Sequence, residues 1–322
     1  MDIAMQPECA LCGSKESAVL RTKVRAGVER KVFRCNACGL VFLEPRDEDL
    51  KEYYREEYRK VYTPAPGRVS ASEEIFKTYL PMQKIRLDKL GGILHKEARL
   101  LDIGCSAGQF LKAVAPHVGT AMGIEYNESD AAFVRSIGYK VWSVPIEETD
   151  IPLASLDIVT VYQTFEHVKE PQRFLKSIAK YLKPDGHLVI EVPNVHDPLL
   201  TVFADEGYED FYYKEAHLFY YAPDTLWRTL ERAGYKGDVT TIQRYHVLNS
   251  FSWIYTGTPQ RSAEVGMGEP SLPMAQGVDE DVAARFNAWI RAADRAYKDM
   301  LIDLHLGESL FFIGTKVPET SA

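Results

Sequence analysis

Four cysteines near the N-terminus have the spacing of a zinc site. Cys9 and Cys12 form one Cys-x2-Cys pair, Cys35 and Cys38 form a second, and 22 residues separate the two pairs. Each pair is followed by a glycine, which leaves backbone N–H groups able to donate to sulfur. Because four thiolates fill a tetrahedral zinc ion, the pattern predicts a Zn2+ that folds this segment rather than one that catalyses a reaction.

A glycine turn later in the chain has the spacing of a ligand-binding loop. It runs from Asp102 through Gly104 to Gly108 and follows a short apolar segment. Glycines at such a turn let a ligand approach the backbone and meet the first N–H groups of the next helix. The Asp-x-Gly-x-x-x-Gly spacing differs from the Gly-x-Gly-x-x-Gly of dinucleotide binders. Glu125 ends the next apolar run, where its carboxylate can accept hydrogen bonds from two ribose hydroxyls.

These residues need a parallel sheet to bring them together. From residue 99 to 192 short apolar runs alternate with helical stretches, which is typical of a doubly wound α/β fold. The expected strands are Arg99–Ile103, Ala121–Glu125, Tyr139–Ser143, Leu156–Tyr162 and His187–Val192, with helices near Gln109–Val118, Ser129–Ile137 and Pro171–Leu182. A helix at Pro223–Ala233 and strands at Val239–Val247 and Leu310–Lys316 are expected to follow a long loop at 193–222.

Several motifs in register resemble the class I S-adenosylmethionine-dependent methyltransferases over residues 99 to about 246. Besides the glycine turn they are Leu156–Val168, Leu182–Gly186 and Glu191–Asn194. The resemblance implies a Rossmann-like sheet of seven strands whose last strand is antiparallel. It also implies that S-adenosylmethionine lies across the strand ends and donates a methyl group.

The same resemblance implies which residues bind the cofactor. They are Asp102, Gly104, Cys105, Gly108, Phe110, Glu125, Tyr126, Ile146 and Gln163. Asp102 and the glycine turn would hold the methionine part, Glu125 the ribose, Ile146 the adenine face, and Gln163 the region near the sulfonium. Ser106 stands where many members have a glycine. Cys105 also fits a small packing residue of the turn.

Two histidines could act on the acceptor. His217 lies in a segment that resembles the family's His-x-x-Tyr-(Phe/Tyr) motif, and His167 follows the fourth core strand. A base assists methyl transfer when the nucleophile is a hydroxyl or an enolisable carbon. We expect His217 to be the base or to orient the acceptor, with His167 as the second candidate. Tyr220 or Tyr221 would shape the pocket, and Tyr221 is taken as a catalytic candidate.

The zinc segment ahead of the core is similar to the arrangement in sugar C-methyltransferases and related enzymes that act on glycans. Those enzymes carry a further C-terminal α/β domain, whereas this chain ends soon after its last expected core strand. O- or N-methylation of a saccharide, nucleotide sugar or other small molecule is therefore expected at least as much as C-methylation.

Two other functions fit parts of the sequence. Some RNA base methyltransferases also begin with a zinc ribbon, and a non-catalytic adenosylmethionine-binding scaffold could use this segment to dock a partner. The chain has 38 Lys and Arg against 46 Asp and Glu, a net charge of −8, which argues against a nucleic acid partner. Salt-sensitive RNA binding by residues 1–45 would favour the RNA alternative.

The expected organisation has five parts. They are a zinc ribbon (1–45), a helical linker or lid (46–98), the methyltransferase core (99–248), a helical insertion (249–308), and the last core strand with the tail (309–322). A helix near 279–306 repeats apolar residues, so one of its faces is expected to be buried, over the acceptor pocket or in a homodimer. With no run of about 18 apolar residues and no signal peptide, we expect a soluble cytoplasmic protein with no membrane partner.

Overall fold

The core of the protein is a seven-stranded sheet. In a computed structural model that describes residues 7–46 and 70–317, six strands are parallel and β11 is antiparallel to both of its neighbours. The strand order is β10 (Tyr235–Ile242), β11 (Ser309–Lys316), β8 (Leu182–Pro193), β7 (Leu156–Tyr162), β4 (Arg99–Ile103), β5 (Thr120–Ile124) and β6 (Lys140–Trp142). The predicted sheet with one antiparallel strand is confirmed.

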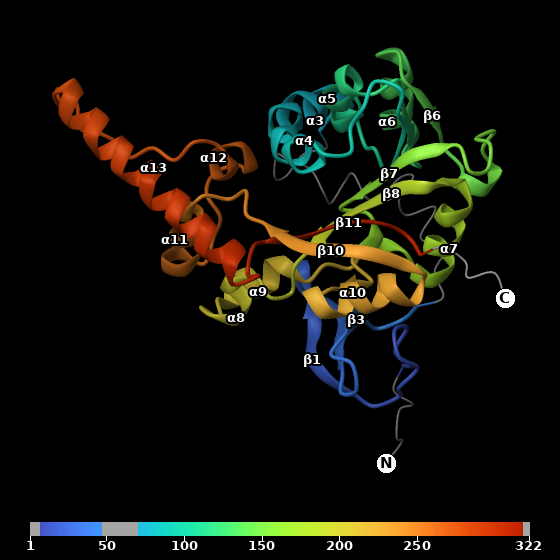
Figure 1. Ribbon diagram of the computed structural model, residues 1–322. Coiled ribbons are helices and arrows are strands. Elements are labelled where there is room, and N and C mark those ends of the chain that lie inside the picture. Colours follow the sequence, from blue (N-terminus) through green and yellow to red (C-terminus); the bar gives the residue numbers. More distant parts are fainter. Residues whose placement is uncertain (1–6, 47–69, 318–322) are drawn as a thin grey trace.

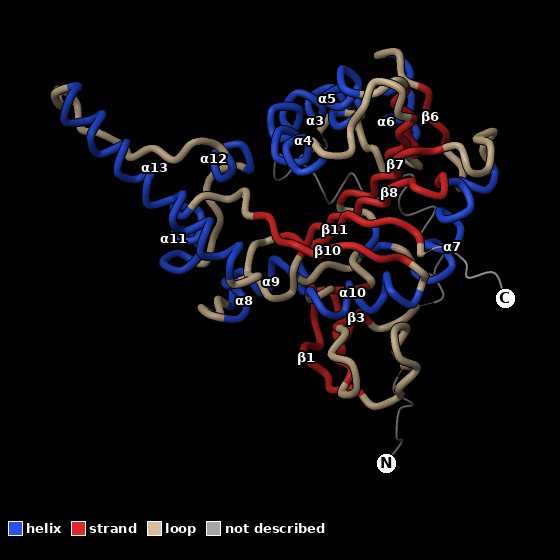
Figure 2. The backbone as a smooth tube through the Cα atoms, viewed as in Figure 1, coloured by secondary structure: helices blue, strands red, loops and turns tan. Residues whose placement is uncertain are grey.

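Helices cover both faces of this sheet (Figures 1 and 2). Successive strand residues point to opposite faces, so Leu100 packs in one apolar cluster and Leu101 in the other. The first face is covered by α4 (Lys84–Leu90), α5 (Gln109–Val114) and α6 (Glu128–Ser136), with α3 (Ser72–Tyr79) beside them. The second face is covered by α7 (Pro171–Tyr181) and α10 (Pro223–Arg232).

The cysteine-bearing segment forms three strands of a second sheet, and a later segment of the chain adds the fourth strand. Its strands are β1 (Ser17–Val24), β2 (Val28–Cys35), β3 (Val41–Leu43) and β9 (Phe219–Tyr220), in that order. β9 comes from the expected long loop after β8, which also contains the helices α8 (Pro198–Thr201) and α9 (Glu206–Tyr212). The Leu43 N–H donates to the Leu218 carbonyl at 2.9 Å, so the N-terminal sheet holds the segment that carries His217.

Three helices are inserted between β10 and β11. They are α11 (Val247–Thr256), α12 (Ala263–Met267) and α13 (Glu280–Asp303), and α13 projects from the body of the molecule (Figure 1). The strand predicted to reach Val247 ends at Ile242 instead. His246 caps α11 there, because its Nδ1 accepts the Asn249 N–H.

The apolar stripe of the last helix is not buried within a single chain, so of the two expected covers the acceptor pocket is excluded and the homodimer stays a prediction. Phe286 and Trp289 are 55% and 62% exposed. The buried residues of α13 are instead Ile290, Asp294 and Leu301, on another face of the helix. Asp294 holds this face of α13 against α11, because its carboxylate accepts the Val247 N–H at the start of α11, at 2.9 Å.

Some predictions fall outside the described residues. Among these predictions are residues 47–69 of the helical linker or lid predicted at 46–98, whereas Tyr79 of the same segment is described and lines the cavity discussed below. Within the described ranges no helix combines the length and the hydropathy needed to cross a bilayer.

Candidate active site

A large cavity opens at the carboxyl ends of the parallel strands, where ligands bind in open α/β sheets. Its volume is 1470 Å³, and the ends of β4, β5, β7 and β8 reach it through Ile103, Ile124, Tyr162 and Pro193. A pocket for one small ligand typically measures about 300–1,000 Å³. The cavity is therefore large enough for two ligands side by side.

The glycine turn forms one end of this cavity. Gly104 adopts φ 78°, and a Cβ atom there would collide with the side chain of Thr164. Ser106, where many family members have glycine, also has a left-handed backbone with φ 50°. The turn thus keeps the conformation that brings its backbone against a ligand.

Glu125 ties this turn to the end of the neighbouring strand. Its Oε2 accepts the Ser106 N–H at 2.8 Å and its Oε1 accepts the Asn127 N–H at 2.8 Å. The side chain also lines the cavity. Each carboxylate oxygen has a second lone pair, so Glu125 can hold the turn and still accept a ligand hydroxyl.

Asp102 is a buried acid at the floor of the same end. It is 2% exposed and accepts a hydrogen bond from Thr160 Oγ1 at 2.7 Å. Burial raises the pKa of Asp102 to about 7. A ligand cation beside this carboxyl would favour its ionised form.

A group of charged residues that the sequence analysis gave no role lies next to Asp102. Glu191 on β8 binds Arg86 Nε at 2.8 Å and Arg244 Nη2 at 2.7 Å. Burial alone would raise the pKa of Glu191, but the two guanidinium charges lower it to about 2. Gln163 donates from Nε2 to Glu191 Oε1 at 2.9 Å, so its amide is oriented by this group. A carboxylate inside the apolar run of β8 was the signal available in the sequence.

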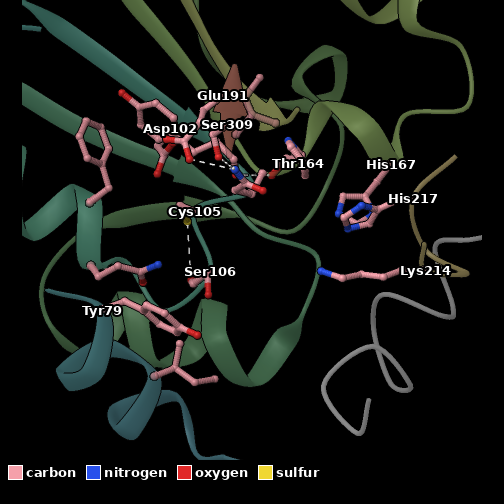
Figure 3. A pocket seen from close by; sticks show the side chains of 18 of the residues that line it. Tyr79, Asp102, Cys105, Ser106, Thr164, His167, Glu191, Lys214, His217 and Ser309 are labelled. Carbon is pink, nitrogen blue, oxygen red and sulfur yellow. Dashed lines mark hydrogen bonds between the residues drawn. The ribbon is translucent and has the colours of Figure 1, made fainter. Parts of the chain in front are cut away.

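A second buried polar group lies at the other end of the cavity (Figure 3). Glu166 Oε1 is 3.7 Å from His167 Nε2 and 4.0 Å from His217 Nε2. His167 Nδ1 donates to the Ala216 carbonyl at 2.8 Å, which leaves its Nε2 facing the carboxyl. Neither Glu166 oxygen has a hydrogen-bond partner among the described residues. The sequence analysis named both histidines but missed Glu166, although it directly precedes His167.

Burial controls the protonation of this group. It raises the pKa of Glu166 to about 8 and lowers that of His167 to about 4. It also lowers the pKa of His217 well below the usual histidine range, and that of Lys214, whose side chain runs beside the two histidines (Figure 3), to about 7. Both imidazoles are therefore neutral at neutral pH and able to accept a proton. The ligand atoms of Glu166 and the two histidines lie within 4.8 Å of one another, a spacing that could also hold a cation.

Most of the predicted cofactor residues line the cavity. They are Asp102, Gly104, Cys105, Phe110, Glu125, Tyr126 and Gln163. Gly108 does not line it but starts α5 with φ 78°, packed against Val134. Ile146 is buried in the core, and its neighbours Pro145 and Glu147 line the cavity in its place.

The two tyrosines after His217 lie behind the cavity wall. Tyr221 is 1% exposed and stacks on Phe165, with ring centroids 5.5 Å apart. Tyr220 accepts the Lys214 N–H at 2.8 Å and donates to the Lys214 carbonyl at 2.9 Å. Neither tyrosine lines the cavity, so their contact with an acceptor would be indirect.

The four N-terminal cysteines converge on one point. The Cys9 and Cys38 sulfurs are 3.5 Å apart, as are those of Cys12 and Cys35, and all four lie within 4.8 Å of one another. A tetrahedral zinc ion with Zn–S bonds of about 2.3 Å would place its sulfurs about 3.8 Å apart. The N–H groups of Leu11 and Cys12 donate to Cys9, and those of Ala37 and Cys38 donate to Cys35. The geometry and these donors fit a zinc ion.

Comparison with known proteins decides the family. Residues 78–239, half of the chain, match the family described as "Methyltransferase domain". The chain belongs to this methyltransferase family. Among curated relatives, a ubiquinone biosynthesis O-methyltransferase of Coxiella burnetii is 27% identical over 169 residues, which cover 48% of this chain and 71% of the relative. One from Acinetobacter baumannii is 29% identical over 132 residues, covering 38% and 54% of the two chains.

Solved structures agree on the fold of the methyltransferase. A SAM-dependent methyltransferase from Archaeoglobus fulgidus matches with a TM-score of 0.50 and 22% identity, over 76% of this chain and 97% of that one. Family and fold together identify an S-adenosylmethionine-dependent methyltransferase.

Proposed function

We propose that the methyltransferase methylates a hydroxyl of a small acceptor, a sugar or nucleotide sugar, with His217 as the base. The observation that carries the proposal is a single cavity that joins the glycine turn to the buried group of Glu166, His167 and His217. One end suits the methyl donor and the other offers neutral imidazoles to a nucleophile. Methyl transfer needs mainly the alignment of these two partners, which an enclosing cavity supplies.

The turn end would hold S-adenosylmethionine, which supplies an electrophilic methyl group when bound. Its amino-acid part carries an ammonium and a carboxylate, and the cavity presents Asp102 and Arg86 to them. Glu125 would accept hydrogen bonds from the ribose hydroxyls. Cys105, Phe110 and Tyr126 would pack against the rest of the nucleoside, and Gln163 would lie near the sulfonium.

The histidine end would take the acceptor proton. As the acceptor oxygen bonds to the methyl carbon and the S–CH3 bond breaks, the hydroxyl proton would pass to the His217 imidazole. S-adenosylhomocysteine and the methyl ether are the products. Glu166 Oε1, 4.0 Å from His217 Nε2, would face the resulting imidazolium and stabilise it where the carboxyl, with a pKa of about 8, is ionised. His167 is the second candidate for the base.

The acceptor end combines rings with basic side chains. Tyr208, Phe211 and Tyr212 line the cavity, as do the basic side chains of Arg25 and Lys214, whose charges act on His217. Aromatic faces suit the apolar faces of a sugar ring, and the basic groups suit a phosphate. These features support a phosphorylated saccharide over a neutral apolar acceptor.

The relatives suggest a second candidate acceptor, a phenolic hydroxyl. The two relatives above are named as ubiquinone biosynthesis O-methyltransferases. Their names support O-methylation, and the same ring-lined end could stack an aromatic acceptor. The basic side chains favour the saccharide.

We also propose that Cys9, Cys12, Cys35 and Cys38 bind a structural Zn2+. The four sulfurs leave no position for a substrate, so the ion would act on folding alone. Its effect on catalysis would come through β3, which pairs with β9 just after His217.

Turnover assays test this function. The purified enzyme would be incubated with S-adenosylmethionine and matched panels of nucleotide sugars, free sugars and phenols, and S-adenosylhomocysteine would be measured by mass spectrometry. Release that depends on a nucleotide sugar supports the proposal, and release only with phenols supports the second candidate. Absence of S-adenosylmethionine binding in calorimetry would overturn the cofactor site itself.

A further inference from the structure

The exposed face of α13 carries a regular apolar pattern. Its members, here called the α13 seam, are Val282, Phe286, Trp289, Ala293, Ala296 and Met300. Successive members are separated by four and three residues in alternation, which is the heptad period of a helix that packs along another helix. Val282 is 43% exposed, Trp289 62% and Met300 49%, so the seam is open at both ends and in the middle, and Ala293 alone among its members is half-buried.

The part of the chain that the structure describes covers other faces of α13 and leaves the seam uncovered. Asp294 and Tyr297 contact α11, the latter through a 2.9 Å hydrogen bond to Ser250. Asn287, which lies on the same face as Ile290 and Asp294, accepts the Leu272 N–H through Oδ1 at 2.8 Å, so the segment before α13 folds back along that face. On a helix of 3.6 residues per turn the seam lies about a quarter turn from the α11 face, away from the returning segment.

We infer that the α13 seam is a homodimer interface in which two copies of the helix pack antiparallel about a two-fold axis. In such an interface each contact occurs twice, residue i with j and j with i. With the axis beside residue 291, Trp289 meets Ala293 of the second copy, Phe286 meets Ala296, and Val282 meets Met300. In the first two of these contacts an aromatic side chain meets an alanine. Such pairs let the side chains of each helix fit into the spaces between those of the other.

Side-chain size separates this arrangement from the parallel one. A parallel pair would place Trp289 against its own copy and Phe286 against its own copy, and would leave two alanine layers underfilled. Both aromatic residues lie in the first half of the seam and both alanines in the second half. Only an antiparallel arrangement places the first half of one seam against the second half of the other.

The charges beside the seam are also complementary in the antiparallel arrangement. Arg285 and Asp299 both flank its solvent side, one near each end. Antiparallel packing brings Arg285 of one copy next to Asp299 of the other, and the two-fold axis repeats this pair. The occupant is therefore a second copy of this chain.

Sedimentation of the full chain tests the interface. We expect a dimer whose dissociation constant rises at least about thirtyfold in Trp289→Glu, the loss typical of a central aromatic contact. Leu153→Glu, which changes a 65% exposed apolar residue in the core domain, is the matched control and should leave the dimer unchanged. Unchanged circular dichroism and S-adenosylmethionine affinity would show that Trp289→Glu still folds.

A charge exchange tests the orientation. Arg285→Glu should weaken the dimer roughly fivefold by placing like charges together, and the added change Asp299→Lys should restore it. A parallel dimer would show no such restoration. A wild-type chain that stays monomeric at high concentration, including one that binds lipid vesicles through Trp289 instead, would overturn the inference.

Discussion

Burial sets the chemistry of the single side chains in and directly behind the cavity wall. Asp102 and Glu166 are both acids with pKa values raised by burial, and His217 is a base whose charged form is disfavoured for the same reason. Glu191 is equally buried, yet two arginines keep it ionised. Neighbouring charge therefore decides which of these groups is an anion before a ligand arrives.

Cofactor affinity is expected to depend on pH through Asp102. Its carboxyl is about half protonated near pH 7, and a bound ammonium favours the ionised form. The affinity should therefore level off above pH 7 and fall as the pH drops, by up to about tenfold per pH unit well below the pKa. Calorimetric titration of S-adenosylhomocysteine across this range measures the effect. Asp102→Asn should bind weakly with a flatter profile, and a flat wild-type profile would contradict the role.

Removal of the proposed base is expected to affect turnover and spare cofactor binding. His217→Asn should lower kcat by roughly 10²–10⁴-fold, the usual contribution of a positioned base. His95→Asn, a change at a half-exposed histidine far along the chain, serves as control. Equal turnover in His217→Asn and wild type would leave His167 as the base, to be tested by the same substitution.

At the scale of elements, the core could be predicted because its signals are local. The predicted strands Arg99–Ile103 and Leu156–Tyr162 have those bounds in the structure, since each is a short apolar run ended by a turn. Asp102 and Glu125 were found for the same reason, because each sits at the end of such a run. Local patterns fix the edge of the sheet and the residues beside it.

Other features depend on contacts between distant segments. Arg86 and Arg244 meet at Glu191 only through the fold, and no spacing in the sequence relates them. β9 is two residues long and exists because β3 pairs with it. The period of the α13 stripe was visible in the sequence, but it does not say whether the face packs inside the chain or against another copy.

The contacts of Glu125 lead to a prediction about the turns after β4 and β5. Glu125→Ala would remove the acceptor for the Ser106 and Asn127 N–H groups together with the proposed ribose contact. Cofactor affinity should fall by at least about tenfold, the equivalent of one charge-assisted hydrogen bond. Glu128→Ala, at an exposed residue nearby, is the control in the same titration. A loss of equal size in the control would point to a general disturbance of this edge.

At the scale of the whole molecule, the N-terminal sheet and the catalytic core are joined around the acceptor end. Arg25 contributes to both: its N–H donates to the Tyr213 carbonyl at 2.7 Å, and its side chain lines the cavity. Arg30 adds a bond from Nη1 to the Glu215 carbonyl at 3.2 Å. Within residues 7–46 and 70–317 the cofactor end has no such dependence, because the glycine turn and Glu125 directly follow β4 and β5 of the core sheet.

Loss of zinc should therefore disturb the acceptor end of the cavity and leave the cofactor end able to bind its ligand. We expect a chelator that removes the ion to lower Tm by at least about 5 °C, because metal binding contributes directly to the folding of such modules. Turnover should fall strongly while the affinity for S-adenosylhomocysteine changes little, since β9 and His217 lose their support and Glu125 does not. Metal content by mass spectrometry, calorimetry and turnover would be followed together, with recovery on added Zn2+ as the control. Full turnover in a protein shown to contain no zinc would mean that pairing of β3 with β9 holds the acceptor end without the ion.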